Sequence, residues 1–461
     1  MENTNTRADK GAPKESARKM PTASAVLADG SLLEMIHNRE TSTTAFVLYK
    51  DGAWTVVPNL TLPDGRILAP FSPLNNLLTH DVVLFPSEPE EYGSKLELLD
   101  AIRSFVHRYV DLTSLFEQIA AHYVLLSWVY DGFQELPYLR VMGSPGSGKT
   151  RCLLTVGSLC YKPIFASGAS TVSPLFRILD SMKGTLVLDE ADFRFSDEKS
   201  DVTKILNNGT VRGFPVLRAE QNAQTKEFNP HAYHVFGPKL VAARSGFEDR
   251  GLESRFISER LGMQHLRHDV PISLGDAHRQ EAQKLRNQLL LFRLRNHGKV
   301  SVPIDLDRTL EPRLLQSFGP LLAVIDDERV KKDVMALARQ YQGQLLADRG
   351  IDLDGRILEV IRDLTKDSDV PPTVKEIAAD FARRYGDEIQ GRVTPHWIGW
   401  QIRKRLGLST QRRNSGYVIA PSEATKLAGL YERYGLAEAR APESSPSTPS
   451  SPSPTGPGPP P

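Results

Sequence analysis

Cysteine is almost absent from this chain, which has only Cys152 and Cys160 among its 461 residues. Both lie in a stretch expected to be helical, so they are predicted to pack as small apolar side chains, and neither a disulfide framework nor a zinc site is supported. Long apolar runs are also lacking. The best candidate, residues 120–130, falls short of the roughly 20 apolar residues that a bilayer-spanning helix needs. We therefore expect a cytoplasmic protein with no membrane partner.

A net charge of one sign is lacking too, because 57 Lys and Arg face 56 Asp and Glu, for a formal charge of +1. This balance argues neither for nor against nucleic-acid binding, which only local clusters of charge can indicate. With 40% hydrophobic and 25% charged residues, the chain can bury a large core and is expected to form two or three domains.

A glycine-rich run carries the most information: Gly143, Ser144, Pro145, Gly146, Ser147, Gly148, Lys149 and Thr150. It fits the G-x-x-x-x-G-K-[ST] phosphate loop, in which backbone N–H groups and a helix N-terminus surround phosphate oxygens. Residues 138–142 are predicted to form the strand before it, and apolar spacing predicts a helix after it. Lys149 is assigned to the β and γ phosphates of ATP, and the Thr150 hydroxyl to Mg²⁺.

A second motif follows, where the apolar residues 185–188 lead into Asp189 and Glu190. This is the Walker B arrangement, in which Asp189 joins Thr150 in the Mg²⁺ shell and Glu190 polarises the water that attacks the γ-phosphate. A solvated acidic turn is the alternative when the motif is taken alone. Between the motifs, Ser173 and Pro174 predict a helix start and Gly184 its end. The alternation of strand and helix predicts an α/β fold with a parallel sheet.

The rest of the chain divides by composition and periodicity. β-prone pieces dominate up to about residue 86, two amphipathic helices follow, a hairpin is predicted within residues 213–236, and residues 239–243 form a further strand. The expected organisation is a disordered leader (1–21), a small, strand-rich α/β N-terminal domain (22–111), the phosphate-loop core (112–275), a helical lid (276–350), a winged helix (351–437) and a disordered Pro/Ser-rich tail (438–461).

The expected winged helix contains the clearest cationic patch, namely Arg403, Lys404, Arg405, Arg412 and Arg413, with no acidic residue between positions 392 and 421. Such a patch on a helix and wing could meet DNA phosphates while the helix enters a major groove. A merely solvated basic face, or a surface that docks another protein, remains the alternative. Trp397 and Trp400 in the same helix are expected to serve core or interface packing rather than base stacking.

Together these motifs resemble the AAA+ ATPases, and within them the minichromosome-maintenance (MCM) type replicative helicases and their relatives on plasmids, phages and integrated elements. The likeness covers about residues 112–348. Two sharper segments add to it, residues 241–244 and 252–256. The resemblance implies that Arg255 is an arginine finger that acts across a subunit boundary. It also implies that Arg244 ends a sensor 1 strand, although MCM proteins usually have asparagine there.

The same resemblance implies a sensor 2 arginine in the lid, for which position suggests Arg313, and a pore-lining hairpin in which Arg218 and Lys226 are candidate DNA contacts. Ordinary surface charge is the alternative for those two residues. The zinc-bearing N-terminal domain of cellular MCM proteins has no counterpart here, which favours a relative from a mobile element.

The implied function is an ATP-hydrolysing DNA motor, a helicase that forms a hexameric ring on single-stranded or forked DNA, with an initiator or replication protein as a possible partner. The alternative is an AAA+ regulator or loader that remodels a protein at a DNA site held by the winged helix. A simple P-loop kinase or GTPase is disfavoured, because it would leave Arg255 and the long helical segment unexplained.

Overall fold

The computed structural model describes residues 19–190, 197–221, 228–247, 249–262, 267–302, 307–366, 370–386 and 393–437. The chain divides into two compact units, Met1–Arg339 and Gln340–Pro461. Helix α10 (Glu328–Ile351) contains residues of both. The units therefore divide inside this helix, whereas the expected lid runs almost to its end. Within the described residues, no helix is both long enough and apolar enough to cross a bilayer.

A five-stranded parallel sheet organises the first unit, and its presence confirms the predicted α/β class. Its strands run in the order β14-β8-β13-β10-β9, and every neighbouring pair is parallel. The bounds are β8 (Tyr138–Met142), β9 (Ile164–Ser167), β10 (Leu186–Asp189), β13 (Lys239–Ala243) and β14 (Phe256–Arg260). All of β13 is buried, as expected for a central parallel strand that has helices on both faces. The predicted strands at 138–142 and 239–243 are thus observed.

Helices cover this sheet. They are α2 (Lys95–Tyr109), α3 (Ser114–Trp128), α4 (Lys149–Gly157), α5 (Val172–Met182), α6 (Asp197–Asn208), α8 (Asp276–Asn296) and α9 (Pro312–Leu322), with the short α7 (Arg250–Glu253) and η1 (Tyr130–Gly132) between them. A capping box between Ser94 and Glu97 starts α2. Helix α3 is buried almost all round, because it packs against α2, α4, α8 and α9. Helix α5 begins at Val172, two residues before Pro174, so the start predicted at Ser173 is slightly late.

The N-terminal strands form two small sheets. One is the antiparallel order β2-β3-β4-β5 and the other is β1-β7-β6. The bounds are β1 (Lys19–Pro21), β2 (Ser24–Val26), β3 (Leu32–Asn38), β4 (Thr43–Lys50), β5 (Ala53–Val57), β6 (Leu60–Thr61) and β7 (Ile67–Ala69), followed by α1 (Asn76–Thr79). Strand β1 falls within the range expected for the leader, so the folded chain begins by Lys19. Residues 1–18 and 438–461 lie outside the described residues.

This strand-rich region shares its core with the parallel sheet rather than folding apart from it. Leu33 and Phe46 belong to the same buried cluster as Tyr138 and Ile164. A buried charge network reinforces the junction: Arg293 of α8 pairs with Glu34 of β3 at 2.6 Å and with Asp131 at 2.7 Å. Because the Arg293 and Glu34 side chains are each 3% exposed, helix α8 is anchored to both the N-terminal region and the core.

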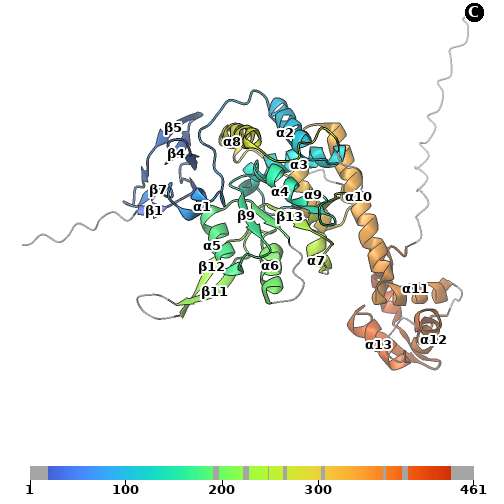
Figure 1. The fold of residues 1–461 in the computed structure, drawn as a ribbon. Helices are drawn as coiled ribbons and strands as arrows, with labels where there is room; N and C mark the ends of the chain where they lie inside the picture. The colour runs from blue at the N-terminus through green and yellow to red at the C-terminus, as the bar shows by residue number, and fades with distance from the viewer. Residues whose placement is uncertain are drawn as a thin grey trace, which may run out of the picture. The chain divides into compact units, whose positions relative to one another are not determined.

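A β-hairpin, β11 (Val216–Gln221) and β12 (Phe228–Tyr233), precedes β13 and extends away from the parallel sheet (Figure 1). Its strands are observed where a hairpin is predicted. They are shifted, however: β11 starts after the predicted Gly213, and β12 ends at Tyr233. The segment 222–227 that joins them lies outside the described residues.

The second unit contains three helices and a two-stranded ribbon, followed by a further helix. Beyond α10, the elements are α11 (Leu353–Lys366), α12 (Val374–Tyr385), α13 (Pro395–Lys404), β15 (Thr410–Arg413), β16 (Gly416–Ile419), η3 (Pro421–Glu423) and α14 (Ala424–Arg433). Ile357, Phe381 and Ile402 are fully buried in its core, so the three predicted apolar faces meet as expected. Trp397 packs against Phe381, as predicted. Trp400 is 47% exposed, so it is not part of this core, and packing at an interface stays a prediction for this residue.

Candidate nucleotide-binding site

The glycine-rich run lies at the carboxyl end of β8 and leads directly into α4. This is the edge of a parallel α/β sheet at which ligands bind. A Cβ on Gly143 would lie 2.8 Å from the carbonyl oxygen of Leu261, so only glycine fits this close approach. Gly148 caps α4 with a φ of 92°, a left-handed conformation that glycine adopts without strain. The loop thus has the backbone geometry that its sequence predicts.

Lys149 and Thr150 begin helix α4, and Thr150 faces the strand that ends in Asp189. The Thr150 hydroxyl donates to Asp189 Oδ2 at 2.6 Å. The Lys149 ammonium donates to the carbonyl oxygens of Gly143 and Ser144, at 2.7 and 2.8 Å. Folding therefore brings together, at one end of the sheet, the lysine, hydroxyl and carboxylate that the two motifs supply. Paired hydroxyl and carboxylate oxygens are donors that suit Mg²⁺.

Two further predicted residues lie at the same edge. Glu190 follows Asp189 with its side chain exposed and a φ of 54°, and its N–H donates to Asp189 Oδ1 at 2.9 Å. Arg244 follows Ala243, whose carbonyl accepts from the Gly143 N–H. Both side chains therefore start next to the phosphate loop. Among the described residues, no cluster of three or more His, Cys, Asp or Glu could bind a metal.

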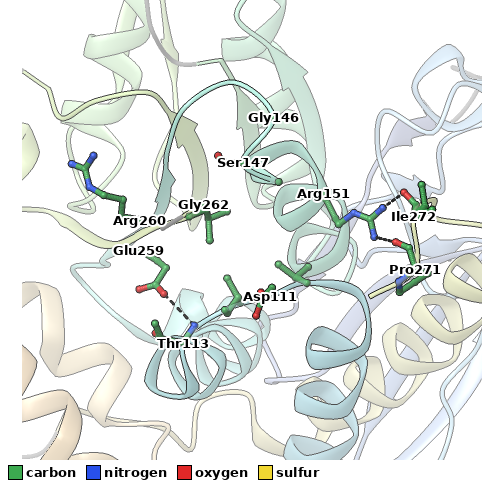
Figure 2. A pocket seen from close by; sticks show the side chains of 14 residues that line it. Asp111, Thr113, Gly146, Ser147, Arg151, Glu259, Arg260, Gly262, Pro271 and Ile272 are labelled. Carbon is green, nitrogen blue, oxygen red and sulfur yellow. Dashed lines mark hydrogen bonds between the residues drawn. The ribbon is translucent and has the colours of Figure 1, made fainter. Parts of the chain in front are cut away.

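A pocket of about 500 Å³ opens beside the phosphate loop (Figure 2). Gly146, Ser147 and Gly148 form one wall. The other lining residues are Val110, Asp111, Leu112, Thr113, Arg151, Glu259, Arg260, Leu261, Gly262, Pro271 and Ile272. Except for the three loop residues, the sequence motifs do not identify this lining, because it comes from chain turns with no phosphate-binding pattern. The one local signal is Thr113, the N-cap of α3.

Two contacts fix the walls of this pocket, and both are drawn in Figure 2. Arg151 of α4 donates to the carbonyl oxygens of Pro271 and Ile272, which ties the segment before α8 to the phosphate-loop helix. Glu259 of β14 accepts from the Thr113 N–H at 3.2 Å. Burial raises the pKa of Glu259 above its usual range. The pocket therefore combines apolar lining with a small set of polar and charged groups, as is typical of small-molecule sites.

Arg255 lies at the opposite end of the sheet from the phosphate loop. Strands β14 and β8 are parallel and pair Phe256 with Tyr138, so Arg255 precedes the first residue of β8 while the loop follows the last. Five strand residues separate the two ends, which corresponds to roughly 15 Å. Arg255 is therefore distant from the phosphate loop of its own chain.

The Arg255 side chain is half-buried and has defined partners. Its guanidinium donates to the carbonyl and side-chain oxygens of Asn207. Asn207 in turn donates to Asp249, the N-cap of α7, at 3.2 Å. Hydrogen bonding to Asn207 lowers the pKa of Asp249, whereas burial lowers that of Arg255. Arg255 is thus held in one direction rather than left free in solvent.

Arg313 lies beside Arg255 and not beside the phosphate loop. The two arginines line one small cavity, of about 60 Å³, together with Glu135, Leu136, Thr210, Val211, Gln316 and Ser317. Arg313 donates to the Ser254 hydroxyl at 3.4 Å. The structure thus brings the finger candidate and the sensor 2 candidate together on one face.

An ion pair joins the middle of β8 to α7, between a buried arginine and a partly exposed glutamate. Arg140 of β8, 2% exposed, donates to both carboxylate oxygens of Glu253 in α7 and to the Ser258 hydroxyl at 3.0 Å. Its guanidinium also lies over the Phe256 ring, 4.8 Å from the centroid. Sequence reasoning missed this residue, because an arginine inside an apolar strand has no motif around it.

The candidate DNA contacts of the hairpin differ in placement. Arg218 is half-buried, with its guanidinium 4.8 Å from the centroid of the Phe176 ring of α5, a contact that holds it toward the core. Lys226 lies outside the described residues. Phe228, which pairs with Gln221 at the far end of the described ribbon, is 70% exposed. An exposed aromatic ring there was not identified from sequence.

All five predicted basic residues of the second unit are exposed. Arg403 and Lys404 end helix α13, and Arg412 and Arg413 lie on β15. Arg405, however, pairs with Asp354 of α11 at 3.0 Å. Although the segment 392–421 itself has no acidic residue, the fold therefore places an acidic side chain from α11 beside the patch. The exposed Trp400 precedes Lys404 by one helical turn, so these two residues share a face.

Comparison with known proteins yields likenesses only to solved structures. No protein-family model matches the sequence, and no curated protein sequence matches it. The chain is similar to SCCmec type IV Cch, described as an active helicase, with 12% identity over 88% of this chain and 99% of that one and a TM-score of 0.39. The chain is also similar to the C-terminal region of NrS-1, with 11% identity over 84% of this chain and 96% of that one and a TM-score of 0.36.

A full-length MCM homolog from Methanopyrus kandleri is 13% identical over 65% of this chain and 67% of that one, with a TM-score of 0.36. These identities and TM-scores are low. The account of function below therefore rests on the geometry of the chain itself.

Proposed function

We propose that this protein is an ATP-hydrolysing, ring-forming motor of the AAA+ class that acts on DNA. The observation that carries the proposal is that the phosphate-loop residues and Arg255 lie at opposite ends of one sheet. Lys149, Thr150 and Asp189 meet at one end, and Arg255 lies at the other. Neither half is complete within a single chain, but two copies arranged head to tail would complete each other's site.

The nucleotide half would bind ATP with its phosphates in the loop 143–150 and its base in the pocket beside Thr113. Mg²⁺ would be held by Thr150 and Asp189, and it supplies neutralisation of phosphate charge when bound. Glu190 would orient and deprotonate water opposite the leaving phosphate. From its position after β13, Arg244 would reach the γ-phosphate.

The arginine half would act on the neighbouring copy. Arg255, oriented by Asn207, would stabilise charge on the neighbour's γ-phosphate, which contributes about 10³ to 10⁵ in rate for such fingers. Because Arg313 shares the Arg255 cavity, we assign it to this same half. Assembly, expected as a hexamer, is then part of catalysis.

Two regions are proposed to meet DNA. The β11–β12 hairpin would contact single strands, with Phe228 stacking on bases and Lys226 and Arg218 close to phosphates. The three helices and ribbon of the second unit would act as a winged helix that contacts the phosphate backbone of duplex DNA through Arg403, Lys404, Arg412 and Arg413. Arg405 would contact DNA while it also pairs with Asp354. We also propose that the protein comes from a mobile genetic element, such as a plasmid, a phage or an integrated element.

The alternative is an ATP-operated regulator or loader that remodels a protein partner at a DNA site. The same nucleotide geometry would serve it, but the exposed Phe228 and the projecting hairpin favour a role on single strands.

ATP hydrolysis measured alone, with single-stranded DNA and with forked DNA, beside strand displacement, tests the proposal. We expect single strands to raise hydrolysis, and Phe228→Ala to lose most of that stimulation. The matched control is Phe214→Ala, which removes an equally exposed ring just before β11. If only a protein partner raised hydrolysis and no strands separated, the regulator would be the correct function.

A further inference from the structure

A second pocket, remote from the DNA-facing elements, lies where helix α8 packs on the back of the phosphate-loop helix. Its volume is about 250 Å³, below the roughly 300–1,000 Å³ typical of pockets for drug-sized ligands. The lining comes from three regions of the first unit, namely Arg39, Asp81, Leu84, Leu154, Ser158, Phe165, Leu274, His278, Arg279, Ala282 and Arg286. Its size suits a small ion better than a nucleotide.

Positive charge dominates this lining. Arg39, Arg279 and Arg286 face one carboxylate among the described lining residues, Asp81, which pairs with Arg39. The arginines are close enough to act on one another: burial and then Arg39 lower the pKa of Arg286, and burial and then Arg279 lower that of Arg39. Like charges held together at a partly enclosed site favour an anion between them.

Two buried nitrogens of lining residues have no hydrogen-bond partner within the part of the chain that the structure describes. Arg286 is 4% exposed, and although its terminal nitrogens donate to Ser158 and Gln283, its Nε has no partner. His278 is 6% exposed, and its Nε2 has none either. Burial lowers the pKa of His278 to about 4, so the imidazole is neutral near pH 7. The Arg286 guanidinium therefore has only part of its hydrogen-bonding capacity satisfied within the described residues.

We propose that this pocket binds a compact oxyanion, of which phosphate is the type, through Arg286, Arg279 and Arg39. The tetrahedral oxygens would accept from the two rim arginines, and the buried Arg286 guanidinium would add positive charge behind them. Leu154 and Ser158 of the lining belong to the helix that begins at the phosphate loop or to the turn after it. The pocket is therefore attached to the nucleotide-binding half, yet it shares no lining residue with the pocket beside Thr113.

Titration of the full chain with inorganic phosphate at constant ionic strength, followed by calorimetry, tests this site. Lys149→Ala is the background, because it removes the main phosphate-loop cation. The unaltered chain saturated with Mg²⁺ and a non-hydrolysable ATP analogue is a second background, which keeps the test decisive if Lys149→Ala does not fold. In either background we expect one phosphate to bind per chain.

Substitutions at the rim then identify the pocket. Arg279→Gln and Arg39→Gln should each weaken phosphate binding about tenfold, since each removes one charge-assisted hydrogen bond. Asp81→Asn should strengthen it, because it releases Arg39, and asparagine tolerates the positive φ of 58° at this position. A purely structural role for these residues would produce no gain.

Lys284→Gln is the control, an exposed cation on α8 that does not line the pocket. Equal phosphate affinity in all four variants, or no phosphate bound in either background, would overturn the proposal. So would a competition experiment in which single-stranded DNA bound at the Arg279 rim and inorganic phosphate failed to displace it.

Discussion

Asp189 and Glu190 are adjacent in sequence but differ in environment. Asp189 is partly buried and accepts from Thr150, whereas Glu190 is exposed beyond the strand end. The first is placed to hold a metal shell and the second to approach water. At this scale the two carboxylates are expected to be separable by mutation.

Glu190→Gln should bind ATP as the unaltered chain does and lose about 10² to 10⁴ of its turnover, because the loss of a general base removes that factor. Asp189→Asn should weaken binding of Mg²⁺-ATP itself. Nucleotide binding by fluorescence and phosphate release in the same samples check this. Equal turnover in Glu190→Gln and the unaltered chain would assign the base elsewhere.

Lys239 makes stability depend on pH. It is fully buried, its ammonium donates to the carbonyls of Val235 and Gly237, and burial lowers its pKa to about 7. Between that value and its ordinary 10.5, the unfolded chain binds a proton that the folded chain does not. Stability should therefore rise with pH in this window, by up to about 1.4 kcal/mol per pH unit.

Urea unfolding at about pH 7 and about pH 7.8 measures this slope below the range in which the exposed thiols of the unfolded chain titrate. Burial also lowers the pKa of Lys162 to about 7, so Lys239→Met should reduce the slope without abolishing it. Lys284→Met, at an exposed position on α8, should leave it unchanged. A slope unaffected by Lys239→Met would mean that Lys239 stays protonated in the fold.

At the scale of elements, α7 connects the two ends of the sheet. Glu253 in this short helix pairs with the buried Arg140 of β8, and Arg255 follows two positions later. The orientation of the finger therefore depends on a strand whose other end is the phosphate loop. Arg140 is a positioning residue in this account.

Arg140→Met should cost about 1 to 3 kcal/mol of unfolding free energy, because the partly exposed Glu253 loses the buried cation that it faces. It should also lower assembly-dependent ATP hydrolysis while ATP binding stays intact. Lys50→Met removes one partner of an exposed pair and should change neither. Normal hydrolysis in a folded Arg140→Met chain would contradict the positioning role.

Sequence predicted the elements that local pattern determines. Gly148, Thr150 and Asp189 belong to short motifs in which neighbouring residues set both the backbone conformation and the functional groups. The strands β8 and β10 and the helix α4 that carry these motifs are observed as predicted. Contacts between segments that are distant in sequence leave no local motif, and the ion pair of Arg405 with Asp354 is one example. The exposed position of Phe228 at the far end of the hairpin is another feature that no local motif indicates. Helical periodicity also does not say which of Trp397 and Trp400 the core includes, and Trp400 is the exposed one.

At the scale of the whole molecule, the first unit is one body with the N-terminal strands built into it. Glu34 and Arg293 are buried against each other, and removing one partner of such a pair leaves an uncompensated charge. Composition predicted a separate small N-terminal domain. A core that the N-terminal strands share with the parallel sheet leaves no pattern in the sequence. A hexameric assembly, proposed for this unit, would use its two sheet ends as complementary faces.

Mixing two inactive variants tests this central claim most directly. Glu190→Gln keeps its Arg255 but cannot activate water, and Arg255→Ala keeps Glu190 but lacks the finger. Each alone should hydrolyse ATP poorly, whereas an equimolar mixture should recover activity, since about a quarter of the shared sites in random rings would be complete. Activity of the mixture no greater than the mean of its two components would contradict a site shared between neighbours.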